Sequence, residues 1–387
     1  MSQKSRPRRL LSVGHSYAVG VNRRLAHEME RVGGGAWEVT VAAPDYFHGN
    51  DLRPVRLEVR PDEPCRAVPL TAYLTRRVHV FLYGRRLRAL LGEGWDVVHA
   101  WEEPYILSGG QVALWTPPAA ALVFRTAQSI DKRYPPPFGW VERFAMGRAA
   151  GWICSGSLVA QTLTPREGYD KPNAQIPLGV DVDQFRPDPA AAAAALRQLG
   201  WDPAGPPVVG YLGRFVPEKG ICLLTRALDG LAGPWRALFV GAGPMEPYLR
   251  AWAARHGDRV RLCTGVTHDR VPAYLGAMTV LCAPSQTTPN WKEQFGRMVV
   301  EAFAAGTPVI GSDSGEIPFV LKDAGVVVGE KDGPGWTRAI GTLLADPARR
   351  RELAARGLQR ARDEFAWPTV ARQYLLFFER VLAARGG

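Results

Sequence analysis

The sequence has few cysteines and no long hydrophobic run. Its five cysteines are scattered through 387 residues, and no two of them stand at a spacing typical of zinc ligands. An odd number of scattered cysteines is typical of a reducing compartment, so we expect free thiols rather than a disulfide framework. The best candidate for a membrane span, residues 112–124, is broken by Pro117 and Pro118 and is too short. The sequence therefore predicts a soluble, cytoplasmic protein.

Acidic residues are outnumbered by basic ones. The chain has 48 Lys and Arg against 37 Asp and Glu, which gives a formal net charge of +11. This excess implies acidic partners, among them nucleotide phosphates, anionic lipid or nucleic acid. The aromatic-rich basic platform that stacks nucleobases is missing, so nucleic acid is not expected as a partner. An Asp-x-Asp motif at a strand end is missing too, because Asp181 and Asp183 lie between the two halves; no metal is expected.

Apolar strand patterns alternate with helical patterns along both halves of the chain. The strands predicted in the first half are residues 10–13, 38–41, 97–99, 122–125 and 152–154. Those predicted in the second half are residues 208–212, 237–240, 260–263, 280–283, 309–311 and 326–328. This alternation predicts an α/β fold with mostly parallel sheets that are covered by helices on both faces. We expect one domain at residues 1–178, a hinge at 179–206 and a second domain at 207–367. A last helix, 368–387, is expected to pack back on the first domain. Ligands of such sheets bind at the carboxyl ends of the strands.

A glycine-rich basic loop follows the first strand of the second half. Residues 213–220 read GRFVPEKG. Arg214 offers a planar fork to phosphate oxygens, and Lys219 offers a mobile charge. The next strand is followed by 241–244, which read GAGP, but Glu246 replaces the third glycine of a dinucleotide fingerprint. The pattern favours a phosphate site over a dehydrogenase.

Two glutamates, Glu293 and Glu301, bracket a Phe-Gly step. Gly296 opens a segment, 297–305, that is predicted to be a helix, and the free amides at a helix start bind anions or hydroxyls. The two backbones lie up to roughly 12 Å apart, which is longer than a hydrolase carboxylate pair requires. The pair suits a clamp on two parts of one extended ligand. The alternative is two solvated glutamates beside an amphipathic helix.

Together these motifs resemble the donor-sugar site of retaining glycosyltransferases of family 4. The resemblance is carried by residues 213–220, 241–244, 265–266 and 293–301, and residues 177–187 are similar to the hinge of that family. It is looser in the N-terminal half. The resemblance implies a GT-B fold, in which two Rossmann-like domains with parallel sheets face each other across a cleft. It also implies that the domain at residues 1–178 binds the acceptor and that the domain at 207–367 binds the nucleotide sugar. The reaction it implies is retaining and uses no cofactor and no metal.

The resemblance implies roles for individual residues. Arg214 and Lys219 would hold the diphosphate of the donor, and Glu293 would grip the transferred sugar. The other donor-binding residues would be Gly20, Gly213, Gly243, Val266, Phe295, Gly296 and Glu301, of which Glu301 would bind the ribose hydroxyls. In the first half Trp101 stands where relatives often have an active-site histidine. The acceptor-side candidates are His99, Glu102 and Gln128.

The sequence thus predicts a transferase that moves a sugar from a UDP- or GDP-linked donor to a saccharide or lipid-linked acceptor, in polysaccharide or glycoconjugate synthesis. The alternative is a sugar-nucleotide epimerase of the same fold, which requires proton-transfer groups at the sugar.

Residues 66–91 contain six arginines and no acidic residue, interleaved with aromatic and aliphatic side chains. This is typical of an interfacial helix, so we expect peripheral attachment to the anionic inner face of the membrane. The alternative is an ordinary helix that packs its apolar side on the sheet and leaves the arginines in water.

Overall fold

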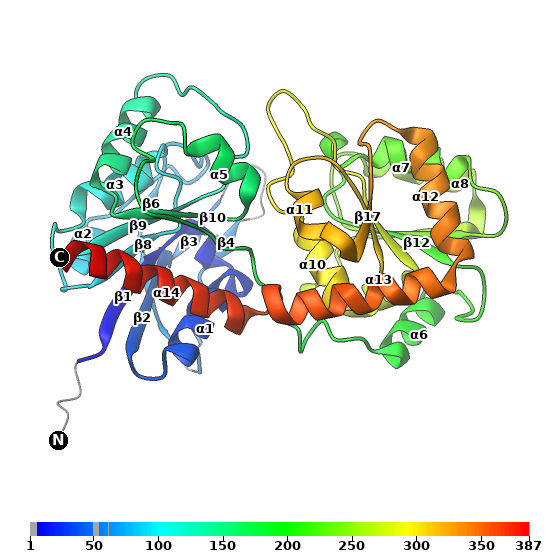
Figure 1. The fold of residues 1–387 in the computed structure, drawn as a ribbon, viewed down its shortest axis with the longest axis horizontal. Coiled ribbons are helices and arrows are strands. Elements are labelled where there is room, and N and C mark those ends of the chain that lie inside the picture. The colour runs from blue at the N-terminus through cyan, green and yellow to red at the C-terminus, as the bar shows by residue number, and fades with distance from the viewer. Residues whose placement is uncertain (1–5, 49–53, 61, 387) are drawn as a thin grey trace. The chain divides into compact units, whose positions relative to one another are not determined.

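The computed structural model describes residues 6–48, 54–60 and 62–386. The chain divides into two compact units, one made of residues 1–177 and 367–387 and the other of residues 178–366. Each unit contains a parallel sheet with helices packed on its faces (Figure 1). The predicted α/β fold with two parallel sheets is therefore confirmed.

In the first unit, the described residues form a sheet of seven strands in which all neighbours are parallel. In spatial order the strands are β11 (Asn173–Gln175), β10 (Gly151–Cys154), β9 (Ala121–Thr126), β8 (Val97–Ala100), β1 (Arg8–Val13), β2 (Trp37–Pro44) and β5 (Arg66–Leu70). The strand order reverses between β1 and β8. Open α/β sheets bind ligands at such a reversal, outside the carboxyl ends of the strands.

Helices cover both faces of this sheet. One face is covered by α1 (Arg24–Gly33) and α14 (Trp367–Gly386), which lie side by side (Figure 1). Buried residues of α14, such as Tyr374 and Phe378, share a hydrophobic core with Leu10 and Val39 of the strands. The other face is covered by α2 (Arg86–Leu91), α3 (Leu107–Trp115), α4 (Phe138–Arg148) and α5 (Ser157–Leu163). Within the described residues, no helix combines the length and apolar character that spanning a membrane requires.

The interfacial helix predicted for residues 66–91 is wrong. Its first residues form the edge strand β5, and the short antiparallel pair β6 (Ala72–Tyr73) and β7 (Leu82–Tyr83) follows; only α2 is helical. Pro69 lacks the N–H that a helix interior requires, and Leu74 has a φ of +58°. The alternation of buried Val68 and Leu70 with less buried neighbours is that of a strand. A second short pair joins β3 (Tyr46–Phe47) to β4 (Val55–Arg56).

The second unit repeats the architecture with six parallel strands among its described residues. In spatial order they are β14 (Val260–Cys263), β13 (Arg236–Val240), β12 (Val208–Leu212), β15 (Val280–Ala283), β16 (Val309–Ser312) and β17 (Gly325–Val328). The order reverses between β12 and β15. The strands alternate their buried side chains between two hydrophobic cores, one on each face.

The helices of the second unit enclose these two cores. They are α6 (Pro189–Gln198), α7 (Ile221–Asp229), α8 (Glu246–Ala254), α9 (Val271–Gly276), α10 (Arg297–Ala304), α11 (Ile317–Leu321), α12 (Gly333–Ala345) and α13 (Pro347–Arg360). Residues 179–206, expected as a hinge, lie in this unit, and α6 packs on α9. Asp188 caps α6 by accepting a hydrogen bond from the amide of Ala191.

Candidate functional site

The loops that follow β12 and β15 meet where the strand order of the second unit reverses. Gly220, in the first loop, has a φ of +71°, and a Cβ at this position would collide with the carbonyl oxygen of Pro284 in the second loop. Glycine is therefore required for this close approach. The approach brings the basic loop 213–220 against the segment that begins at Pro284 and leads to α10.

Lys219 and Glu293 form a buried ion pair between these two loops. The Nζ of Lys219 lies 2.5 Å from Oε2 of Glu293, and the two residues are only 9% and 6% exposed. Ser285 donates a second hydrogen bond of 2.7 Å to the same carboxylate oxygen, and the ring of Trp291 lies 4.9 Å from the ammonium. Since burying charges costs several kcal/mol (order of magnitude) unless they are paired and hydrogen-bonded, these contacts hold both groups in place.

Arg214 lies in the same loop but has a different environment. Its side chain is largely exposed and approaches Glu218 at 3.9 Å, while its carbonyl oxygen accepts a 2.7 Å hydrogen bond from Tyr211. Gly243, after β13, has a φ of +156°, and its Cβ would lie 2.5 Å from the carbonyl oxygen of Phe215. Gly213 also has a positive φ, of +154°. These glycines let the loops after β12 and β13 pack on each other, with the Arg214 guanidinium at the surface.

The predicted helix after Gly296 is confirmed as α10. Gly296 is its N-cap, with a φ of +83°, and Phe295 before it is buried. Within the described part of the chain, the amides of Phe295 and Gly296 have no hydrogen-bond acceptor. Glu301 lies one turn into α10, and burial raises its pKa to about 7, an effect that Arg297 offsets only in part. Val266 follows β14, at the same edge of the sheet, and packs partly buried against the core.

Two of the candidates from the first half lie inside its core. His99 is fully buried on β8, where Ser12 lies 2.8 Å from its Nδ1 and three aromatic rings surround it. Burial lowers the pKa of His99 to about 3, so the ring is neutral. Gln128 is also buried and accepts hydrogen bonds from Tyr134 and Arg166. Both contact neighbours of their own unit, and their acceptor roles stay predictions.

Glu102 takes part in a cluster at the strand reversal of the first unit. Its carboxylate accepts hydrogen bonds of 2.6 Å from Tyr83 and from the backbone amide of His15, and its second oxygen lies 2.6 Å from His15 Nδ1. Burial lowers the pKa of His15, but the charge and hydrogen bond of Glu102 outweigh this, so the pKa is raised overall. Sequence reasoning missed His15. The signal was its place directly after Gly14, at the end of the first strand.

Gly20 lies near this cluster in sequence, in a short 3₁₀ turn, Gly20–Arg23. Its φ is not in the left-handed region, and a Cβ would meet only Arg23 at an ordinary 3.6 Å. Glycine is thus not required there by the backbone. The buried Arg23 beside it donates hydrogen bonds to the carbonyls of Tyr17 and Glu58 and pairs with Glu63, which fixes the loop after β1.

Comparisons with known protein families agree with these motifs. Residues 206–346 match the family model described as "Glycosyl transferases group 1", and residues 19–184 match "Glycosyltransferase Family 4". The chain is 32% identical to a D-inositol 3-phosphate glycosyltransferase of Xylanimonas cellulosilytica, over 75% of this chain and 73% of that protein.

A second relative matches more narrowly. The chain is 36% identical to a GDP-mannose-dependent alpha-(1-6)-phosphatidylinositol monomannoside mannosyltransferase of Mycolicibacterium smegmatis, over 50% of this chain. The match spans about half the length of that relative, 53%. Among solved structures, sucrose-phosphate synthase from Thermosynechococcus elongatus superposes with a TM-score of 0.74 at 22% identity, over 97% of this chain and 100% of that one. This likeness shows a shared fold.

Proposed function

The chain belongs to the group 1, family 4 glycosyltransferases, and on that premise we propose that it transfers a sugar from a nucleoside-diphosphate sugar to an acceptor. The observation that carries the proposal is the buried Lys219–Glu293 pair at the strand reversal of the second unit. The carboxylate of Glu293 holds the ammonium group of Lys219 in a fixed position before any ligand binds. Pre-organised charge of this kind is what stabilises a leaving diphosphate.

In this proposal, different residues of the second unit bind different parts of the donor. Lys219 and the exposed Arg214 stabilise the negative charge that develops on the diphosphate as the bond to the sugar breaks. Glu293 holds Lys219 and offers its carboxylate to the sugar, whose hydroxyls also meet the amides of Phe295 and Gly296. Glu301 accepts hydrogen bonds from the ribose. The two cations take the place of a metal at the diphosphate in this proposal. We also propose that the transfer retains the anomeric configuration.

Donor binding is tested by thermal unfolding in the presence of UDP, GDP or ADP. A ligand that binds only the folded protein stabilises it by about 2.7 kcal/mol at a hundredfold excess over its Kd. We expect UDP or GDP to raise the melting temperature, and the one that does identifies the base of the donor. If none of the three raises it, the proposed donor site is refuted.

The acceptor is proposed to be a polyhydroxylated ring, either a saccharide or a lipid-linked one, as in glycoconjugate synthesis. Support comes from the two relatives, whose names give inositol-based acceptors. Incubation with the donor sugar and such an acceptor should release free nucleoside diphosphate only when the acceptor is present. An altered sugar that remains attached to the nucleotide would instead indicate an epimerase. The anomeric configuration of the product, read by NMR, tests retention.

We also propose that the protein acts in the cytoplasm, attached peripherally to an anionic membrane surface. Tyr73, at the end of β6, and Leu74, directly after it, are 58% and 65% exposed, and the neighbouring Arg76 and Arg77 are exposed as well. Exposed aromatic and aliphatic side chains beside arginines fit the headgroup layer of a membrane. The proposed surface is now a short hairpin and its flanks rather than a helix.

A further inference from the structure

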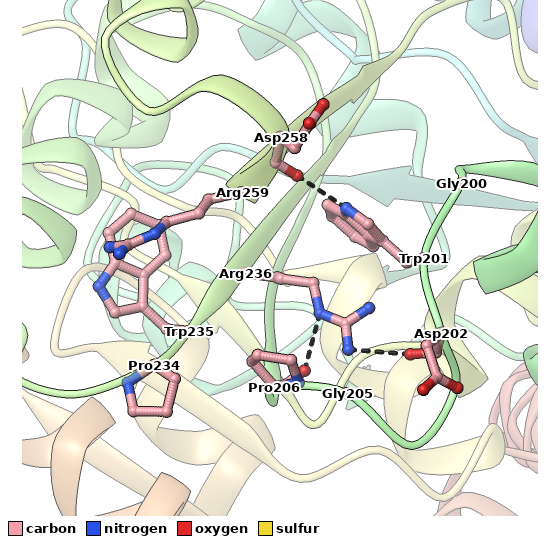
Figure 2. Close-up of a pocket in the computed structure, with 10 residues that line it drawn as sticks. All are labelled: Gly200, Trp201, Asp202, Gly205, Pro206, Pro234, Trp235, Arg236, Asp258 and Arg259. Atoms are coloured by element: carbon pink, nitrogen blue, oxygen red, sulfur yellow. Dashed lines mark hydrogen bonds between the residues drawn. The ribbon is translucent and has the colours of Figure 1, made fainter.

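A cavity of about 420 Å³ lies in the second unit, at the edge of the sheet where strands begin (Figure 2). It is lined by the loop before β12 and by the segments that lead into β13 and β14; among them are Trp201, Pro206, Trp235, Arg236 and Arg259. The loops of the proposed donor site follow the opposite, carboxyl ends of the same strands. Since β13 has five residues at about 3.3 Å each, the two edges are roughly 15 Å apart.

Arg236 lies at the centre of the lining residues (Figure 2) and is only 6% exposed. Its Nε donates to the carbonyl oxygen of Pro206 at 3.0 Å, and its Nη2 donates to that of Asp202 at 2.9 Å. Within the described residues, Nη1 has no hydrogen-bond partner, and the guanidinium has no ion-pair partner. Burial lowers the pKa of Arg236, and the negative charge of Asp202 offsets this effect only in part.

Neither acidic side chain that lines the cavity, Asp202 or Asp258, forms an ion pair with Arg236, although the charge of Asp202 acts on it from a distance. In Figure 2 the carboxylates of Asp202 and Asp258 point away from the guanidinium. Asp202 accepts a hydrogen bond from the amide of Ala204, and Asp258 pairs with Arg261 at 3.1 Å. The second cation of the cavity, Arg259, lies over the ring of Trp235 at 5.8 Å. Across the described parts of the chain, Arg259 likewise lacks an ion-pair partner.

Two neighbours fix the guanidinium of Arg236 in this position. The ring of Trp201 lies 5.3 Å from it, and the indole N–H of Trp201 donates to the carbonyl oxygen of Asp258 (Figure 2). A Cβ on Gly205 would collide with Nη2 of Arg236, so a side chain at 205 would displace it. The cation is thus held rigidly, with one donor group left over and a cavity beside it.

We infer that this cavity binds a small metabolite that carries one oxyanion, a carboxylate or a phosphate, on a ring. Although most of the guanidinium is buried, its Nη1 reaches solvent, and an anion that binds there gains a charge-assisted hydrogen bond. The volume is within the range of small-ligand sites, and the exposed Pro206 and Pro234 supply apolar surface for the ring. The site is separate from the proposed donor site, and its ligand regulates or anchors rather than reacts.

Binding is tested by calorimetry on the full chain with three probes: glucose 1-phosphate, glucuronate and neutral glucose. We expect one or both anions to bind and glucose not to bind, and the stronger anion distinguishes phosphate from carboxylate. Arg236→Met should weaken binding about 10- to 100-fold, as expected for the loss of a charge-assisted contact. Arg255→Ala, an exposed arginine of the same unit that pairs with Asp229, should change nothing.

Further variants separate this site from folding and from the donor site. The variant Gly205→Ala keeps every charge and should still weaken the binding of the anion. The melting temperature of this variant reports whether the unit remains folded. Lys219→Ala should keep the affinity for the anion, and UDP or GDP should not compete with it. The inference is overturned if no anion binds, if Arg236→Met binds equally well, or if Lys219→Ala abolishes binding. Failure of nucleotide binding with intact anion binding would count against the proposed function alone.

Discussion

At the scale of single residues, the Lys219–Glu293 pair makes the most direct prediction. Lys219→Ala should weaken the binding of nucleoside diphosphate by about 1.5–3 kcal/mol and leave nucleoside binding nearly unchanged, because the ammonium contacts phosphate oxygens. Calorimetry with UDP and uridine, or GDP and guanosine, measures the difference. Lys322→Ala, which removes an exposed lysine that approaches Glu364 at 3.4 Å, is the control. An equal loss of affinity for the nucleotide and for the nucleoside would contradict the assignment of Lys219 to the diphosphate.

Glu301 makes a pH-dependent prediction. Its pKa is raised by burial to about 7, so the folded protein holds a proton that the unfolded chain releases near pH 4.5. The contribution of this group to stability is therefore full below about pH 4.5 and is lost as the pH rises through 7, with a magnitude of roughly 1–3 kcal/mol. Urea unfolding at pH 5 and pH 8 should show Glu301→Gln gaining stability relative to the wild type at pH 8. The same difference at both pH values would contradict the raised pKa.

Single residues also show where sequence reasoning stops. Lys219 and Glu293 could be singled out because each belongs to a motif with fixed spacing, but their pairing joins residues 74 positions apart in the chain, which no local pattern indicates. His15 and Glu102 are separated by 87 residues, so nothing in the local pattern indicated that they form one cluster. His99 follows a strand pattern as a functional histidine does, yet burial decides its chemistry. Arg236 stood in an apolar strand and carried no motif at all.

At the scale of elements, the contact between the loops after β12 and β15 makes a prediction. Gly220→Ala should lower stability by about 1–2 kcal/mol for the left-handed backbone alone, and by more because its Cβ collides with Pro284. It should also weaken nucleotide binding, since Lys219 is displaced from Glu293. Gly233→Ala is a matched control: its φ is +78°, and nothing lies within 4 Å of the added Cβ. Equal effects of the two substitutions on nucleotide affinity would argue against the loop contact.

Elements were predictable to different degrees in the two units. All the strands of the second unit were predicted, because each is an apolar run that ends at a glycine, a serine or a proline turn. β5 and β11 of the first unit were missed. Both are edge strands with unfavourable composition: β5 contains Pro69, which only an edge position tolerates, and β11 is the polar Asn173–Gln175. The same proline is excluded from a helix interior, so the first residues of the segment 66–91 are not helical.

At the scale of the whole molecule, the reaction is predicted to need no metal. Asp181 and Asp183 form the one Asp-x-Asp considered as a magnesium ligand, and the structure places Asp181 in a turn, where its Oδ1 accepts hydrogen bonds from the amides of Asp183 and Gln184. Transferase activity should therefore survive treatment with EDTA. A complete loss that magnesium restores would refute a mechanism in which Lys219 and Arg214 alone neutralise the diphosphate. The measurement is the release of nucleoside diphosphate with acceptor present.

The last prediction concerns attachment to a membrane surface by the first unit. Arg76, Arg77, Arg85 and Arg86 are all exposed around the short hairpin of β6 and β7. Near an anionic bilayer each basic residue contributes about 1 kcal/mol, so the four together should give reversible binding that salt weakens. The protein should sediment with anionic vesicles at low salt, and replacement of these four arginines by Glu should abolish sedimentation.

A charge-matched control decides whether this effect belongs to the surface or to net charge. Replacing Arg226, Arg255, Arg338 and Arg351, which are exposed in the second unit, by Glu changes the net charge equally. Because attraction to a membrane falls off within a Debye length of about 10 Å at 0.1 M salt, only charges close to the bilayer count. This control should therefore still sediment. Serine at Tyr73 and Leu74 should weaken binding without removing the salt dependence. No sedimentation of the wild type, or equal loss in both quadruple variants, would end the membrane proposal and leave the arginines as an ordinary solvated surface.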